Sequence, residues 1–274
     1  MIKIWILLLC SAIVPLSSIY AQETPATTTT TTTTTNYTVL PPNPLPLFEF
    51  EGGYWMPKLN GHVFVTDGNR STDVNFKSDL GLRDDHGIPE GQVILNTGPE
   101  SNIHATYLYL DSDGSNNLSR TIVYDGRTYP ATTHVTSSLK VQYFSLGWLW
   151  NFIHEQGFKL GLIVDAKGIS ARSSLNAPAY GFSNSQHFTG AAPTPGLSTE
   201  YKIIRHLSIF AEITGLPAGR YGYFLDTEGG LKWNIIRNLD LSIGYRAIDV
   251  KIDYKNDSGN LSLQGPFAAL TLKF

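Results

Sequence analysis

The chain has 274 residues, of which 42% are apolar and 12% aromatic. Only 16% are charged, against roughly 25% in ordinary soluble domains. The 20 basic and 23 acidic side chains give a formal net charge of −3, which excludes the concentrated positive charge of a nucleic-acid-binding protein.

The N-terminus reads as a secretory signal. Lys3 supplies the positive start, an apolar run follows, and small residues precede a predicted cut after Ala21. A transmembrane anchor is the alternative, but Pro15 interrupts a run already shorter than the roughly 20 residues needed to span. Cys10, the single cysteine, lies inside residues 1–21. The mature chain is therefore expected to hold no disulfide, thiolate metal site or cysteine nucleophile.

Residues 22–45 are a Thr/Pro-rich stretch with an unbroken threonine run from Thr27 to Thr35. Such a composition cannot build a packed core, so we expect a disordered linker. The texture changes at residue 46, and a β-barrel domain is predicted over 46–274.

In that domain, apolar and polar residues alternate with period two, which is typical of strands. In the segment 207–215, for example, Leu207, Ile209 and Ile213 share one face, whereas Ser208 and Glu212 share the other. We count ten candidate strands, with eight or twelve as alternatives because 90–98 is weak and 60–66 with 72–80 could add a hairpin. They are 47–57, 90–98, 102–112, 137–153, 158–173, 189–204, 207–217, 220–236, 239–254 and 260–274.

Short and long connections alternate along the chain. Turns are predicted near 99–101, 154–157, 205–206 and 237–238, and long polar segments at 58–89, 113–135, 174–188 and 255–259. This layout favours an all-β fold: a transmembrane, antiparallel, up-and-down barrel of an outer membrane.

The second face of the strands carries more charge than a dry protein interior tolerates, which favours a polar lumen over a soluble β-sandwich. Opposite charges there could pair and fill the lumen or line a narrow hydrated path. The lumen-lining candidates are Glu49, Glu51, His104, Lys159, Asp165, Lys167, Glu200, Lys202, Glu212, Asp226, Glu228, Lys232, Asp240, Arg246 and Lys273.

The last segment alternates strictly and stops at Phe274. It resembles the terminal strand of bacterial outer-membrane proteins, and the resemblance implies that Phe274 is part of the signal read by the barrel assembly machinery. Gly53-Tyr54-Trp55, Asp79-Leu80-Gly81-Leu82 followed by Asp84-Asp85, and 109–113 are similar to an uncharacterised group of small barrels, broadly OmpW-like or OmpA-like. No activity transfers with that resemblance.

Catalytic and metal-binding patterns are sparse. His86 beside Asp84 and Asp85 could hold a divalent cation, but the spacing is generic. Nucleophilic catalysis needs a base next to a hydroxyl, and two loop histidines have serine neighbours. These sets are His134 with Ser137 and Ser138, and His187 with Ser183 and Ser185. Neither set reproduces a hydrolase or acyltransferase motif, so no enzyme activity, cofactor or metal is predicted.

We therefore expect an integral outer-membrane protein of a Gram-negative bacterium, either structural or a narrow channel for small polar or amphipathic solutes. The expected partners are outer-membrane lipid, lipopolysaccharide, the assembly machinery and small solutes, with no nucleic acid. The alternatives are a surface module that binds a ligand, host surface or phage through its loops, and a lipid A- or phospholipid-modifying enzyme.

Overall fold

The computed structural model describes residues 45–274, except 68–69, 83–86, 125–126 and 255–256. The predicted signal and nearly all of the predicted linker lie outside the described residues, as do Asp84, Asp85 and His86. The described residues form strands and two short 3₁₀ turns, η1 (Pro178–Tyr180) and η2 (Gly219–Tyr221). No helix among them is long and apolar enough to cross a membrane.

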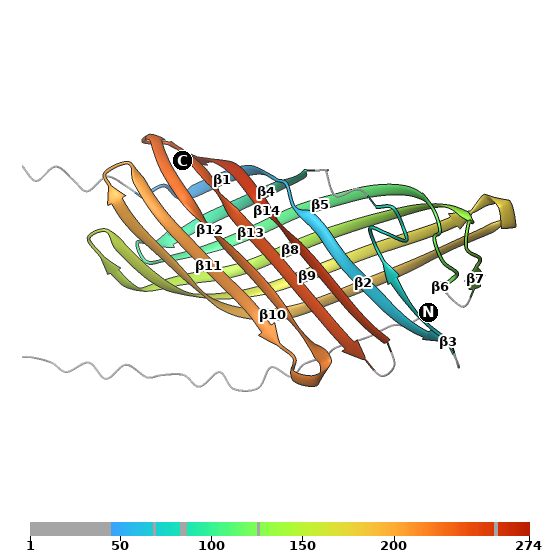
Figure 1. Ribbon diagram of the computed structural model, residues 1–274. Coiled ribbons are helices and arrows are strands. Elements are labelled where there is room, and N and C mark those ends of the chain that lie inside the picture. The colour runs from blue at the N-terminus through green and yellow to red at the C-terminus, as the bar shows by residue number, and fades with distance from the viewer. Residues whose placement is uncertain (1–44, 68–69, 83–86, 125–126, 255–256) are drawn as a thin grey trace, which may run out of the picture. The chain divides into compact units, whose positions relative to one another are not determined.

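Ten strands form a closed antiparallel barrel (Figure 1), which confirms the predicted fold class and strand number. Around the barrel they are β1 (Phe48–Trp55), β4 (Ile88–Gly98), β5 (Ser101–Asn117), β8 (His134–Glu155), β9 (Phe158–Ala177), β10 (Phe182–Ile204), β11 (Leu207–Pro217), β12 (Gly222–Ile236), β13 (Leu239–Tyr254) and β14 (Asp257–Lys273). The weakest predicted strand, 90–98, is β4, which lies between β1 and β5 and is needed to complete the ring.

The barrel closes where the first strand meets the last. β1 pairs with β14 from Glu49 opposite Lys273 to Trp55 opposite Phe267. The backbone carbonyl of Phe274 accepts hydrogen bonds from the amides of Leu47 (2.6 Å) and Phe48 (3.3 Å). This closure removes the unpaired edges that an open sheet would expose.

A hairpin of β2 (Lys58–Asp67) and β3 (Arg70–Asn75) extends the sheet beyond β1. β2 pairs with β14 from Lys58 opposite Gln264 to Phe64 opposite Ser258, where β1 no longer reaches. The extra hairpin considered near 60–66 and 72–80 therefore exists, but it lies outside the closed ring. A second small hairpin joins β6 (Ile122–Tyr124) to β7 (Arg127–Tyr129).

Strands β8, β9 and β10 have 22, 20 and 23 residues and project beyond the other strands on one side of the barrel (Figure 1). The prediction of a long polar loop over 174–188 is wrong, because β9 and β10 stay paired as far as Ala177 opposite Phe182, and only the turn η1 separates them. The Ser- and Asn-rich sequence hides the alternation, although Leu175 and Ala177 are buried on one face.

Side chains alternate between the barrel wall's two faces, as strand geometry requires. On β8, Phe144, Leu146, Trp148 and Trp150 point outward and are 42–49% exposed, whereas Tyr143 points inward and is 3% exposed. Similar outward apolar side chains occur on the other ring strands, and we call this surface the apolar band. It includes Phe50, Val93, Ile103, Leu162, Val164, Leu197, Ile209, Ile213, Leu231, Ile243, Leu270 and Leu272.

The seam at which β14 changes partner from β1 to β2 is tightly packed at Gly265. A Cβ atom there would lie 2.0 Å from the Met56 carbonyl oxygen, and the Gly265 carbonyl accepts a hydrogen bond from the Trp55 indole at 3.1 Å. Gly265→Ala is therefore expected to lower the free energy of unfolding by about 1–3 kcal/mol, as overpacking does. Urea unfolding of the refolded barrel measures this.

The matched control is Gly52→Ala, because a Cβ at Gly52 meets nothing within 4 Å. Equal unfolding midpoints for the two variants would contradict the assignment of Gly265 to a tight seam.

Candidate functional site: the charged lumen

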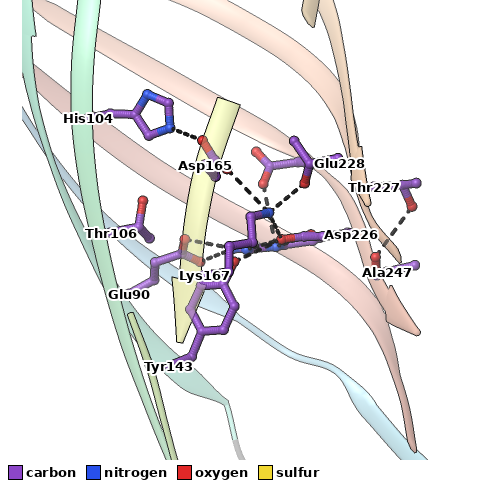
Figure 2. A network of polar contacts seen from close by, with 12 residues as sticks. Glu90, His104, Thr106, Tyr143, Asp165, Lys167, Asp226, Thr227, Glu228 and Ala247 are labelled. Carbon is purple, nitrogen blue, oxygen red and sulfur yellow. Dashed lines mark hydrogen bonds and ion pairs between the residues drawn. The ribbon is translucent and has the colours of Figure 1, made fainter. Parts of the chain in front are cut away.

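Asp226 on β12 is the centre of a network of polar contacts inside the barrel (Figure 2). Its carboxylate accepts hydrogen bonds from the guanidinium of Arg246 at 3.1 and 3.0 Å and from the ammonium of Lys167 at 2.8 Å. The hydroxyl of Tyr143 donates to the same carboxylate at 3.1 Å. All four side chains are buried, and since they come from β8, β9, β12 and β13, the contacts tie opposite walls of the barrel together.

The guanidinium of Arg246 extends the network to β4. It donates two hydrogen bonds to the carboxylate of Glu90, at 2.7 and 2.8 Å, and lies 3.8 Å from Glu228. The rings of Trp55 and Tyr143 lie 5.4 and 5.9 Å from its central carbon, which is cation–π distance. A planar, permanently charged group with five donors suits this position, because each side of it meets an acceptor or a ring.

A second branch of the network runs from Lys167 to β5. Lys167 lies 3.5 Å from Asp165, and the other oxygen of Asp165 lies 3.0 Å from the His104 ring nitrogen Nε2. Gly147 leaves room for this contact, since a Cβ there would lie 1.9 Å from the Asp165 carboxylate. The glycine is therefore required by the close approach of two side chains.

Buried charges are tolerated when each is paired and hydrogen-bonded. Here four carboxyl groups, Glu90, Asp165, Asp226 and Glu228, surround the two cations Lys167 and Arg246. The geometry suits a rigid, directional tie across the lumen, because the buried carboxylate of Asp226 accepts hydrogen bonds from three different side chains.

The remaining lumen candidates lie nearer the end of the barrel that holds the short turns and the chain's C-terminus. They form smaller, separate contacts, and two of them, Lys202 and Glu212, are exposed. The contacts are Lys159–Glu200 (3.7 Å), Lys273–Asp240, Thr271–Glu51 (2.6 Å), Asn96–Glu49 (2.8 Å), Ser198–Glu212 (3.0 Å) and Lys232 over the Phe210 ring (5.4 Å).

The other half of the interior is apolar, which the sequence analysis did not anticipate. Inward residues of the ring strands pack there against the segments that follow β3 and β5, and we call this group the apolar plug. Its members include Leu59, Leu80, Leu82, Ile88, Leu108, Leu110, Leu118, Ile122, Tyr129, Val135, Leu139, Val141, Leu175, Ile248 and Leu263. Phe224 and Phe267 also pack against it.

An ion pair fastens the plug segments to each other. Asp79, 3% exposed, accepts hydrogen bonds from Arg120 at 2.7 and 3.3 Å. Burial alone would raise the pKa of Asp79, but the Arg120 hydrogen bonds and one from the Asn75 amide outweigh it and leave that pKa below its usual value. The segments after β3 and β5 are thereby joined by a charged contact at neutral pH.

Three important residues of the site were missed by sequence reasoning: Glu90, Trp55 and Tyr143. Glu90 shares the parity of Gln92 on the strand judged weakest, so its alternation could have identified it. No signal indicated Trp55 or Tyr143, because aromatic residues also fill outward positions. Within the described ranges no group of three or more His, Cys, Asp or Glu residues could hold a metal ion.

No protein-family model and no curated protein sequence matches the chain. Among solved structures, it is similar to the outer-membrane protease OmpT from Escherichia coli, with 12% identity and a TM-score of 0.55, over 85% of this chain and 99% of that one. It also matches the translocator domain of the autotransporter NalP from Neisseria meningitidis, with 11% identity and a TM-score of 0.39, over 85% and 90% of the two chains. At such identities the likeness to OmpT shows a common barrel fold.

Asp226→Asn should destabilise the barrel strongly, because it removes the negative charge shared by two buried cations. Breaking a buried ion pair in this way costs about 3–5 kcal/mol. The matched control is Asp111→Asn, since Asp111 pairs with Lys140 at 3.2 Å on the exposed surface, where such pairs contribute little. Urea unfolding midpoints that fall equally in both variants would contradict a central role for Asp226.

Proposed function

We propose that the chain is an integral outer-membrane β-barrel with a closed lumen, and that its role is to anchor a projecting β-sheet at the cell surface. Two features support a membrane location. The ring strands expose an apolar band outward and keep their charges inside, and a closed ring leaves no backbone edge for lipid to meet. The fold shared with OmpT is compatible with that location.

One observation supports a closed lumen: the Asp226 network bridges opposite walls of the barrel. Arg246 and Lys167 are each 6% exposed although they lie in the middle of the lumen. The apolar plug fills the next layer. Barrels of about eight strands are normally filled by side chains. Because the Asp226 network and the apolar plug fill this ten-stranded barrel, we favour a structural role over a channel.

A non-enzymatic role is part of the proposal, although OmpT is a protease. The two histidines considered for catalysis hydrogen-bond to residues other than the serines expected from the sequence. His134 contacts Ser115 at 3.3 Å and Asn117 at 2.9 Å, and His187 contacts Thr189 at 3.1 Å. Kinship with the OmpW-like or OmpA-like barrels stays a prediction that rests on short motifs.

A second candidate function, binding through the projecting sheet, is favoured by an open edge on β10. This strand pairs with β9 from Phe182 to Tyr201 but with β11 only from Gly196. Residues 182–195 thus have a partner strand on one side alone. Pro193 and Pro195 lack an N–H and so limit pairing near the ring, whereas the outer part of the edge could accept an added strand. A binding activity lost on shortening β9 and β10, with the barrel still folded, would favour this role.

The membrane placement predicts a penalty for charge on the apolar band. Leu162→Arg on β9 is expected to cost about 2–4 kcal/mol of stability in lipid if it lies near the bilayer midplane. Ser170→Arg, on the same face of the same strand but beyond the band, is the control. Refolding into lipid vesicles followed by urea titration measures both, and equal stabilities would contradict the placement.

If the lumen is closed, the protein should conduct no ions across a bilayer. The wild-type protein, shown to be folded by a heat-modifiable gel shift, should give no steady conductance steps in a planar bilayer. Steps that change with Glu228→Ala, and not with Glu155→Ala at the end of β8 remote from the network, would contradict closure and establish the channel instead.

A further inference from the structure

The outer wall carries a polar groove where β2, β3 and β14 meet. It is lined by Asn60, His62, Asn75, Asn260, Ser262 and Gln264, together with Gly61, Lys77 and Ser78. The strands set these residues side by side, with Asn60 opposite Ser262 and His62 opposite both Asn260 and Asn75. The groove is separate from the charged lumen, because the intervening residues Leu59 and Leu263 point inward into the apolar plug.

The groove begins where the apolar band ends. On β14 the outward residues are Leu272, Leu270, Ala268 and Pro266, and the next outward residue is Gln264. The neighbouring strand changes at the same level, since Ala247 lies opposite Gln264 and Asp249 lies opposite Ser262. If the barrel is embedded as proposed above, the groove therefore faces the headgroup layer of the leaflet on the side of the projecting sheet.

The chemistry of the lining selects for a sugar. Four carboxamides and two hydroxyls offer both donors and acceptors at short intervals, which matches the mixed donor and acceptor character of sugar hydroxyls. The one formal charge among the lining residues is the ammonium of Lys77, and the lining includes no carboxylate. The rim carries both signs of charge, from Lys58 opposite Gln264, Lys251 opposite Asn260 and Asp249 opposite Ser262, and Lys251 is paired with Asp253 at 3.1 Å.

We propose that this groove binds the saccharide headgroup of a glycolipid in the surrounding leaflet through its carboxamides and hydroxyls. The inference rests on the proposed membrane location. It assigns to the barrel wall a lipid-specific contact in which side-chain amides hydrogen-bond to sugar hydroxyls.

The test uses the full chain in phosphatidylcholine nanodiscs and, as the probe, the deacylated core oligosaccharide of rough lipopolysaccharide, with and without enzymatic dephosphorylation. Isothermal titration should show binding that falls about tenfold or more in the double variant Asn260→Ala/Gln264→Ala, because at least two hydrogen bonds are lost. Dephosphorylation of the probe should leave this binding in place, because the proposed contacts are to sugar hydroxyls.

The matched control is Gln142→Ala on β8. Gln142 is exposed and follows the apolar band there, two residues from Phe144, so it has the same depth and chemistry on another part of the wall. Absence of binding to the wild type, or equal loss in the control, would overturn the proposal. A failed membrane location is recognised separately, since the chain would then not insert and would show no heat-modifiable gel shift.

Discussion

The carboxylate of Asp226 is the contact on which the interior depends. It lies between the cations of β9 and β13 and also accepts a hydrogen bond from the hydroxyl of Tyr143. Arg246 in turn reaches Glu90 on β4, and Lys167 reaches Asp165 on its own strand, which contacts His104 on β5. A buried ion network is weak evidence for net stability, because desolvation offsets most of the attraction. Its more secure consequence is specificity, since only one register of the strands brings these groups together.

Register also explains why the two halves of the lumen differ. On β5 the inward residues change from His104 and Thr106 to Leu108 and Leu110. In the polar half, ion pairs between wall residues bridge the lumen. In the apolar half, the side chains of the wall alone do not fill the lumen. The segments after β3 and β5 provide it through Leu80, Leu82, Leu118 and Ile122, and the Asp79–Arg120 pair holds these segments together.

The sequence was sufficient for the ring because period-two alternation and closely spaced turns are local signals. It located ten strands and the short turns between them. It failed over 174–188, where Ser and Asn occupy a paired strand and local composition resembles a loop. It also could not anticipate the apolar plug, because Leu80 and Leu139 join one buried cluster only through a chain reversal that no local pattern predicts. Local alternation could have placed Glu90 in the lumen, but not its ion pair with Arg246, which joins residues 156 positions apart.

The same local alternation explains how one wall can serve three environments. Along the outward face of β14, Leu272 and Leu270 suit hydrocarbon, and Gln264, Ser262 and Asn260 suit a hydrated polar layer. Along its inward face, Thr271 contacts Glu51 near the short turns, and Leu263 packs in the apolar plug. Since successive side chains alternate between faces, the residues of the outward face and those of the inward face can vary independently. A change in lumen chemistry therefore need not alter the lipid-facing surface, and a headgroup contact on the wall can coexist with a lumen that conducts nothing.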